Sequence, residues 1–527
     1  MKSVVLDPDQ KGQVSARLFV LSKTGWITFG AVVLIAFLVF FHLSSFPLTW
    51  FDEGSHLHVP KTLVTKGVYA DYSSEGFRYY GPTSGVGPTV FLPIAMVFSI
   101  FGIGLFQARM VAALYLVATL LIFYRLAKGL GGITLGVVAL ALVITSRGVD
   151  LLQYGREVLG EVPGLFFLLA GLWLWFYSWK KPSWWAFAGA GALLGLSLVT
   201  VNQYLILIAP GLGLAFLANL FYYKAVPQRA FVITGALTLG IYLVWLACQI
   251  FFLGPSNAAQ NWALFRQGTT DAALIFSPAL MKRALTELLN LNVYLGVLLP
   301  GLVYGAFLSL PRRKEGLQWG VLFLLVFANL LWYVTASISW SRYAFPGLAI
   351  SSLFVGKLFL DLIDKIKVDR RSGWESLKNG LGIDQSMALK AILVAWLGVM
   401  VIIPLAQDVK DIAFPPFNAP AAMAAYMNDH VSKTALVETW EPEMGFLTNH
   451  NYHFPPPSLL YTANSFIWLG KTPPSTQYDY VQQNLPDYVL VGAFSSWVQL
   501  YPVDFLNAHY HLEKAIGGYQ LYQRNAN

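Results

Sequence analysis

The chain has 527 residues, of which 56% are hydrophobic and 12% are charged, and its mean hydropathy is +0.57. Soluble domains carry roughly 25% charged residues, so this composition argues against a soluble enzyme, a disordered chain and a nucleic-acid partner. The net charge of +8 fits basic loops that face the anionic cytoplasmic leaflet of a bilayer. The single cysteine, Cys248, excludes an intramolecular disulfide and a cysteine-built metal site. The sequence therefore predicts a multi-pass protein of a lipid bilayer.

Apolar runs of about the length of a membrane helix occur about eleven times along the chain. They lie near residues 26–46, 108–124, 133–146, 161–179, 184–199, 204–223, 230–253, 294–310, 317–334, 343–363 and 387–405. A further run, 88–101, is only about fourteen residues long, which fits a helix lying in the membrane interface better than a span.

Basic residues set the expected orientation, because Lys and Arg are enriched in cytoplasmic loops. Those at 2, 11, 17 and 23 place the N-terminus in the cytoplasm of a plasma (inner) membrane protein. If 88–101 does not cross, the later basic groups all fall on that same side: Arg125/Lys128, Lys180/Lys181, Lys224/Arg229, 312–314 and 365–378. Three segments then face outward: 48–87, 254–292 and the residues after about 406.

This pattern predicts two domains. Residues 1–405 form an all-α membrane domain whose first outer loop, 48–107, contains the interfacial helix 88–101. Residues 406–527 form a small extracytoplasmic α/β domain after a Pro-rich linker at 414–420. Its expected strands are 435–438, 488–491 and 518–523, with a helix at 478–484.

The first cluster of polar residues follows the first span. Asp52 and Glu53 stand beside His56 and His58, and these groups can serve as a base, as metal ligands or as both. The alternative is a solvated helix start, where carboxylates are favourable near the N-terminus. The local sequence leaves both readings open.

Two further clusters lie at predicted outer span ends. Arg156, Glu157 and Glu161 either tie two helices together or form part of a site. Arg342 precedes Tyr343 in a short turn, and an arginine there can simply extend to the interface. All three clusters face the same side and mix carboxylates with arginines, as a site that deprotonates an acceptor and holds a departing phosphate requires. Transporters usually place such charges near the membrane midplane instead.

The chain resembles GT-C glycosyltransferases of the protein O-mannosyltransferase superfamily, which also holds the lipid A aminoarabinose transferases and RgtA/B/C/D-like enzymes. The resemblance covers roughly residues 50–175, with a weaker echo at 342–346. The residues that carry it are Asp52-Glu53, Gly67, Gly87-Pro88-Thr89, Phe101-Gly102, Ala108-Arg109-Met110, Tyr124-Arg125, Gly155-Arg156, Glu161 and Phe166. The chain departs from the family in the Gly-Ser-His that follows Glu53, and in the turn 201–203, which lacks a lysine that many members carry.

The resemblance implies a GT-C membrane fold and a transferase that moves a sugar from a polyprenyl-phosphate donor to a glycan, lipid or protein acceptor on the outer face, with inversion. It implies that Asp52 is the general base, and we expect Glu53 and Glu161 to orient the acceptor or a divalent cation. Candidate metal ligands are Glu53, His56 and Glu161.

We expect Arg342 and Arg156 to contact the donor phosphate, because arginine offers two donors to an anion. Arg109 is a further candidate that alternatively pairs with a carboxylate, and His56 and Tyr343 are expected near the substrate.

Two other functions remain open at this point: a flippase or transporter of lipid-linked sugars, and a non-catalytic GT-C-like scaffold. In the C-terminal part, His450 and His453 resemble a ligand pair, but their Asn- and Pro-rich surroundings favour two exposed histidines.

Overall fold

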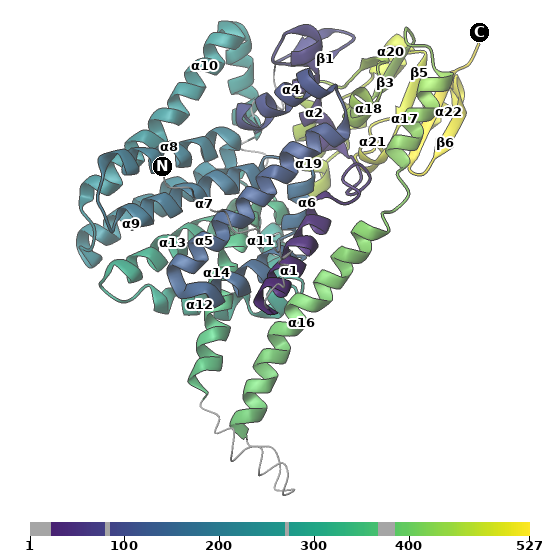
Figure 1. The fold of residues 1–527 in the computed structure, drawn as a ribbon. Helices are drawn as coiled ribbons and strands as arrows, with labels where there is room; N and C mark the ends of the chain where they lie inside the picture. Colours follow the sequence, from purple (N-terminus) through teal and green to yellow (C-terminus); the bar gives the residue numbers. More distant parts are fainter. Residues whose placement is uncertain (1–22, 80–84, 269–272, 367–384, 527) are drawn as a thin grey trace, which may run out of the picture.

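The computed structural model describes residues 23–79, 85–268, 273–366 and 385–526. The helices pack into one bundle, and the C-terminal residues form a separate lobe at one end of it (Figure 1). The basic residues at 2, 11 and 17 and most of the basic stretch 365–378 lie outside the described residues.

Helices are found at all eleven predicted positions. They are α1 (Lys23–Phe40), α5 (Leu105–Thr145, two spans), α7 (Glu161–Ser178), α8 (Trp184–Thr200), α9 (Leu205–Ala218), α10 (Gln228–Gly268), α12 (Leu298–Leu308), α13 (Lys314–Ala336), α14 (Phe345–Lys365) and α16 (Gln385–Ala413). Within the described residues, seven helical stretches are long and apolar enough to cross a membrane. The crossing of all eleven stays a prediction.

Glycines divide the two longest helices. In α5, Gly132 has a φ of +82°, and a Cβ on Gly136 would lie 2.8 Å from the Tyr124 ring, so the two halves fold back on each other. In α10, Gly254 has a φ of +73° and the next residue is Pro255. Glycine tolerates this left-handed backbone at little steric cost. The predicted outer segment after 253 therefore begins at a break and continues as helix.

Shorter elements connect the long helices. They are α2 (Phe51–Lys66), β1 (Asp71–Ser73), β2 (Gly76–Arg78), α4 (Pro88–Phe101), α6 (Leu151–Arg156), η1 (Asn202–Tyr204), η2 (Asn219–Tyr223), α11 (Pro278–Leu288), η4 (Tyr294–Gly296) and η5 (Ser341–Ala344). The predicted interfacial helix 88–101 corresponds to α4, and α2 ends at Gly67 in the left-handed conformation.

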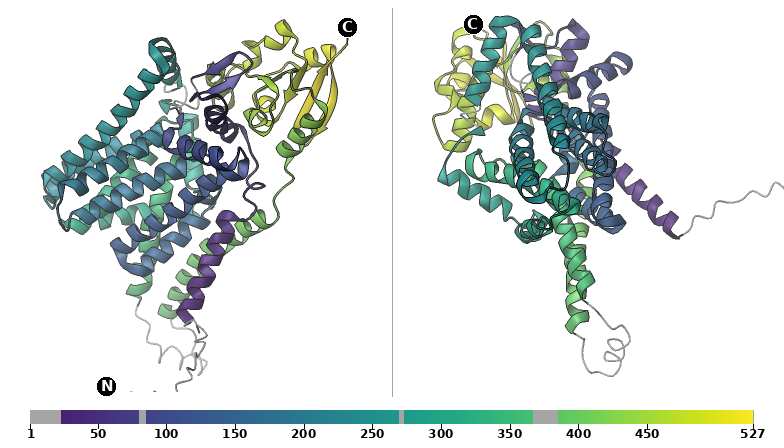
Figure 2. Two further views of the ribbon diagram at one scale, coloured as in Figure 1. Left: turned by 45° about the horizontal axis from the view of Figure 1, so that its top comes forward. Right: turned by 90° about the vertical axis from the view of Figure 1, so that its left-hand side faces the viewer.

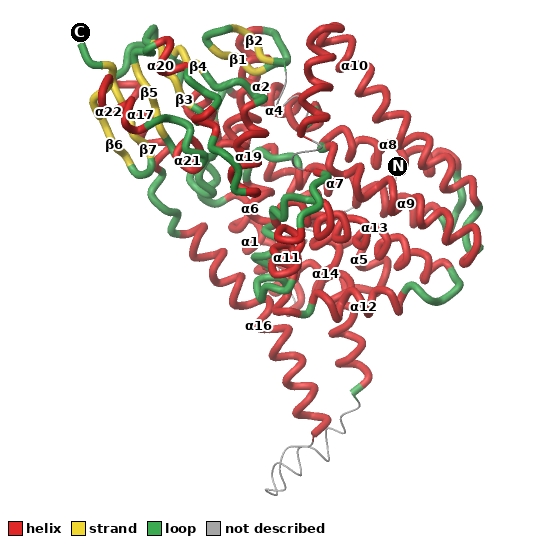
Figure 3. Tube along the Cα trace, turned by 180° about the vertical axis from the view of Figure 1, so that it is seen from behind, coloured by secondary structure: helices red, strands yellow, loops and turns green. Residues whose placement is uncertain are grey.

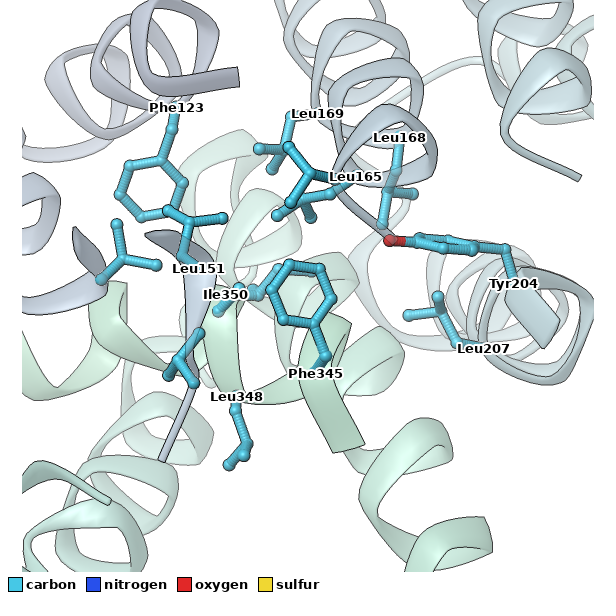
Figure 4. Packing of buried hydrophobic residues seen from close by; sticks show 14 of the residues in the cluster. Phe123, Leu151, Leu165, Leu168, Leu169, Tyr204, Leu207, Phe345, Leu348 and Ile350 are labelled. Carbon is cyan, nitrogen blue, oxygen red and sulfur yellow. The ribbon is translucent and has the colours of Figure 1, made fainter. Parts of the chain in front are cut away.

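Apolar spacing explains how the bundle packs. Leu165, Leu168 and Leu169 recur at the i, i+3, i+4 spacing that puts them on one helix face, and they lie beside Phe345 and Ile350 of α14 (Figure 4). All five side chains are buried. This packing brings the start of α7 close to the start of α14, which is where the polar clusters lie.

The three segments predicted to face outward meet at one end of the molecule. Lys61 Nζ donates to the Gly445 carbonyl at 2.7 Å, and Tyr461 Oη donates to the Leu264 carbonyl at 2.5 Å. At the other end, Lys314 Nζ donates to the Trp179 carbonyl at 2.9 Å. The predicted inner and outer segments are therefore segregated, while the orientation in a membrane stays a prediction.

The C-terminal lobe (residues 419–526) contains a five-stranded mixed sheet, and the strands are confined to this lobe and the β1–β2 hairpin (Figures 2 and 3). The strands are β3 (Leu436–Thr439), β4 (Asn451–His453), β5 (Tyr488–Val491), β6 (Tyr510–Ile516) and β7 (Tyr519–Arg524), in the order β4-β3-β5-β7-β6. β3 is parallel to β4 and β5, and β7 is antiparallel to β5 and β6.

The helices of the lobe are α17 (Ala419–His430), α18 (Pro442–Leu447), α19 (Leu459–Leu469), η6 (Pro474–Thr476), α20 (Tyr480–Asn484), α21 (Ala493–Trp497) and α22 (Val503–His509). The strands and the helix expected from the sequence occur within two residues of their predicted positions. Helix α16 runs through the predicted boundary at 405/406 to Ala413, and the division into two domains stays a prediction.

Candidate active site

Three helix starts bring an arginine between two carboxylates. Asp52 lies in the first turn of α2, Glu161 is the first residue of α7, and Arg342 lies in η5 just before α14. Arg342 donates from Nη1 to Asp52 Oδ2 and from Nε to Glu161 Oε1. Carboxylates are favourable at helix N-termini, so the local sequence and the ion pairs support the same placement.

This network keeps unused polar atoms. The side chain of Asp52 is 25% exposed, against 9% for Arg342 and 6% for Glu161. Arg342 Nη2 makes no hydrogen bond to the described residues, and Glu161 Oε2 is buried without a partner there. Asp52 is therefore the most exposed carboxylate of the network, and Arg342 keeps an unused hydrogen-bond donor beside it.

Glu53 faces away from this network, although it follows Asp52 in the sequence. It accepts two hydrogen bonds from Arg109, at 2.8 and 2.5 Å, and a third from the Val158 backbone N–H at 3.0 Å. Both side chains of the Glu53–Arg109 pair are 0% exposed. The pair ties α2 to α5 and is fully buried, so the proposed function below does not use Glu53 and Arg109 as substrate ligands.

Arg156 is also 0% exposed. Its guanidinium donates to the carbonyl oxygens of Leu38, in the last turn of α1, and of Phe41 and Phe46, which follow the helix. The last carbonyls of a helix lack partners within the helix, and Arg156 satisfies the one of Leu38. Because these contacts occupy the guanidinium, we do not propose Arg156 as a ligand of the phosphate.

His56 and Tyr343, both expected near the substrate from the sequence, lie beside the network. His56 donates from Nδ1 to the Val158 carbonyl at 2.9 Å, and burial lowers the pKa of His56 despite the nearby Asp52. The carbonyl of Tyr343 accepts hydrogen bonds from Gln203 and Asn329, both at 3.1 Å. Tyr343 thus positions the η5 turn that carries Arg342.

The described residues contain no group of three or more His, Cys, Asp or Glu side chains arranged to hold a metal ion. Among the three candidate ligands, both oxygens of Glu53 accept hydrogen bonds from Arg109, and His56 donates to a carbonyl. Glu161 alone keeps an oxygen without a partner. We therefore propose no metal site here.

An apolar cavity of about 400 Å³ lies among α7, α8, α9 and α10. Its walls include Trp175, Leu198, Ile208, Phe216 and Phe231, and none of its described lining residues carries a charge. A hydrocarbon chain fits such walls, whereas a charged group would be desolvated there without a partner.

Comparison with known proteins agrees with this architecture. The profile of the family described as dolichyl-phosphate-mannose-protein mannosyltransferase matches residues 85–247. ArnT from Cupriavidus metallidurans, solved bound to undecaprenyl phosphate, superimposes with a TM-score of 0.63 at 11% identity, over 96% of this chain and 99% of that one. The chain has the GT-C fold. The resemblance to the GT-C superfamily, and to lipid A aminoarabinose transferases within it, is confirmed.

A second solved structure superimposes less closely. The archaeal oligosaccharyltransferase AglB from Archaeoglobus fulgidus, in complex with an inhibitory peptide and a dolichol-phosphate, has a TM-score of 0.54 at 13% identity, over 95% of this chain and 74% of that one. No curated protein matches the chain at the sequence level.

Glu157 belongs to the second polar cluster of the sequence, but the sequence did not predict its own contact, which lies next to the network. Glu157 accepts a hydrogen bond from Trp50 Nε1 at 2.9 Å and is 1% exposed. Burial, together with nearby Glu53, raises the pKa of Glu157 to about 8. Trp340 lies beside Trp50, and the Arg342 guanidinium is 5.2 Å from the Trp340 ring. In the sequence, the signal for this contact was Trp50, which directly precedes Phe51 and Asp52.

Sequence reasoning also missed how α2 is held by the C-terminal lobe. A Cβ on Gly54 would lie 2.3 Å from the backbone nitrogen of Glu443. His58 donates from Nε2 to the Pro442 carbonyl at 2.7 Å, and its Nδ1 lies 2.8 Å from Asp71 Oδ1. Lys61 caps the end of α18 by donating to three carbonyls, those of Gly445, Phe446 and Thr448. One face of α2 therefore carries Asp52, and the other packs against α18.

The expectation of two exposed histidines in the lobe is wrong. His450 is 9% and His453 is 4% exposed. His453 pairs through Nδ1 with the buried Glu438 and stacks on the Tyr480 ring at 3.6 Å. Glu438 also accepts hydrogen bonds from Tyr478 and Tyr501. The sheet buries these histidines, which a short sequence window does not show.

Proposed function

We propose that this protein is a membrane glycosyltransferase that moves a sugar from a polyprenyl-phosphate-linked donor to an acceptor hydroxyl on the extracytoplasmic face. The observation that carries the proposal is the Asp52–Arg342–Glu161 network, in which a reachable carboxylate lies beside an arginine with an unused donor. A base and an anion-binding group are the two parts that such a transfer requires.

The reaction proceeds by one displacement. Asp52 accepts the proton of the acceptor hydroxyl on Oδ1, because Oδ2 is paired with Arg342. The acceptor oxygen forms a bond to the anomeric carbon from the face opposite the phosphate, and this attack inverts the configuration. The bond from the anomeric carbon to the phosphate oxygen breaks, and its electron pair leaves with polyprenyl phosphate. Arg342 Nη2 donates to that phosphate.

The apolar cavity beside α9 and α10 supports a donor with a long hydrocarbon chain. The ligands present with the two GT-C neighbours, undecaprenyl phosphate with ArnT and a dolichol-phosphate with AglB, are of this class. The same proposal places the N-terminus in the cytoplasm of the plasma (inner) membrane and the C-terminal lobe outside. The transferred sugar is a hexose or a pentose, and the acceptor is a glycan, a lipid or a protein.

Replacing Asp52 tests the function. Since a positioned base contributes about 10²–10⁴-fold, Asp52→Asn should lower kcat at least about 100-fold while donor binding persists. The assay follows release of polyprenyl phosphate from a panel of polyprenyl-phosphate sugars by the full chain in nanodiscs. Asp504→Asn, an exposed carboxylate of the lobe, is the control. A fully active Asp52→Asn protein contradicts the proposal.

The same assay separates the alternative functions. A flippase moves the lipid-linked sugar without breaking the bond between sugar and phosphate, and a scaffold releases nothing. Release of polyprenyl phosphate that depends on Asp52 is expected only from a transferase.

A further inference from the structure

A small polar cavity lies in the outer part of α10, next to the turn between α8 and α9. Its volume is about 20 Å³, which holds one water molecule or one hydroxyl group. Asn202 of the turn and Tyr242, Asn261, Trp262 and Phe265 of α10 line it.

One buried polar group in this cavity has no partner. Asn261 is 8% exposed, and its Oδ1 makes no hydrogen bond to any described residue. An unsatisfied buried carbonyl costs about 1–3 kcal/mol, so a donor from outside the chain stabilises this site. An O–H or N–H of a ligand is such a donor.

The walls indicate the charge of that ligand. None of the described residues that line the cavity is charged, so a phosphate, a carboxylate or an ammonium group would lose its hydration without a counter-charge. At the rim, Trp262 and Phe265 are 41% and 36% exposed, with their rings 5.6 Å apart. Aromatic faces of this kind pack against the apolar C–H face of a sugar ring.

The cavity is linked to the ion-pair network through the neighbouring residue of the turn. Gln203 donates to the carbonyl of Tyr343 at 3.1 Å, and Tyr343 directly follows Arg342. The first outer loop reaches the same part of α10, because Tyr69 packs its ring against Trp245 and Phe252. The turn that borders the neutral polar cavity therefore also contacts the segment that carries Arg342 of the ion-pair network.

We propose that this cavity is a subsite for a neutral sugar unit, whose ring packs on Trp262 and whose hydroxyl or acetamido group donates to Asn261 Oδ1. This inference rests on the proposed function, and it restricts the substrate to one with an uncharged sugar at this position.

Binding of simple glycosides tests the subsite without turnover. Methyl α-D-glucopyranoside, methyl glucosaminide and methyl glucuronide serve as neutral, cationic and anionic probes at pH 7. Saturation-transfer NMR with the full chain in nanodiscs measures their binding, with Asp52→Asn used to suppress any reaction. The neutral glycoside should bind at least about tenfold more tightly than either charged one. Equal binding of all three, or no binding, overturns the proposal.

A pair of asparagines one helical turn apart provides matched variants. Asn261→Leu should weaken binding of the neutral glycoside about tenfold, because the hydroxyl loses its acceptor. Asn257→Leu should leave binding unchanged, since Asn257 does not line the cavity and its amide already donates to the Leu253 carbonyl at 3.1 Å. Unchanged binding by a folded Asn261→Leu protein shows that the cavity only holds water. If Asn261→Leu does not fold, the proposal is tested by whether the parent protein binds the neutral glycoside more tightly than the two charged ones.

Competition distinguishes a donor sugar from an acceptor sugar. If the subsite holds the donor sugar, a polyprenyl-phosphate monosaccharide displaces the glycoside while polyprenyl phosphate does not. If the subsite holds the acceptor, the glycoside remains bound with either lipid. Because binding is measured without turnover, an active enzyme that binds no glycoside disproves the subsite alone, and glycoside binding by an inactive protein disproves the transferase alone.

Discussion

At the scale of single residues, the three arginines differ in the atoms they contact. Arg109 is paired with a buried carboxylate, Arg156 donates to backbone carbonyls in and after the last turn of α1, and both arginines are 0% exposed. Arg342 contacts two carboxylates and retains an unused Nη2 at the network. Of the three, Arg342 alone has an unused donor beside a partly exposed carboxylate, so the proposed function uses it as the ligand of the donor phosphate.

Replacing Arg342 should weaken binding of the donor while the C-terminal lobe remains folded. Loss of a hydrogen bond from a charged group costs about 1.5–3 kcal/mol, so Arg342→Ala should raise the donor KM by about tenfold to a hundredfold. Arg342→Lys should recover part of this, because lysine lacks the planar fork of donors. Arg313→Ala, at an exposed ion pair, is the control. If both Arg342 variants bind donor as the parent does, the phosphate lies elsewhere.

At the scale of elements, α2 connects the network to the C-terminal lobe. Its Asp52 face pairs with Arg342, while Gly54 and Lys61 pack against α18 on the other face. The position of the proposed base therefore depends on contacts made by residues near 445.

A side chain at Gly54 should loosen this contact. The new Cβ of Gly54→Ala would lie 2.3 Å from Glu443 N, so the helices must separate. Overpacking of this kind costs about 1–3 kcal/mol, and we expect a lower thermal midpoint together with a lower kcat. Gly240→Ala is the matched control, because no atom lies within 4 Å of its Cβ. Equal stability of the two variants would contradict the close packing of α2 on α18.

The buried carboxyl pair at the start of α18 predicts a pH dependence of stability. Burial, and then the neighbouring Glu441, raise the pKa of Glu443 well above its usual range, and Glu443 Oε2 is buried without a hydrogen-bond partner among the described residues. A carboxyl group whose pKa is raised by folding lowers the free energy of unfolding as pH rises above its pKa in the unfolded chain, which is about 4.3. The loss amounts to about 1.4 kcal/mol for each unit by which folding raises the pKa.

Glu443→Gln removes this titration, because an amide does not ionise. The variant should therefore gain stability over the parent between pH 5 and pH 8, with the difference growing as pH rises. Thermal unfolding in detergent across this range measures the effect, with Asp504→Asn as an exposed control. A difference that does not change with pH would show that Glu443 ionises freely.

At the scale of the whole molecule, segregation of the two ends predicts a topology. Ser183 lies at the end where Lys314 contacts Trp179, and Thr286 lies at the end near the lobe. After replacement of the exposed native Cys248, Ser183→Cys should react with an impermeant reagent only from the cytoplasmic side. Thr286→Cys should react only from the outside. Reaction of both from one side would disprove the topology.

The sequence by itself determined the membrane class, the positions of the helices and the clusters of polar residues at their ends. Those features follow from local composition and periodicity, which short windows contain. Even the strand 488–491 was placed correctly, because its apolar run is short and bounded by Pro486 and Gly492.

Only the tertiary structure decided which charges pair. Asp52 and Glu53 are adjacent, yet one pairs with Arg342, 290 positions away, and the other with Arg109, 56 positions away. Adjacent residues on a helix point about 100° apart, so the packing of α2 against its neighbours selects the partner of each carboxylate. That selection leaves Asp52 partly exposed and buries Glu53. The sequence alone does not show it, because the arginine partners come near only when the whole bundle has folded.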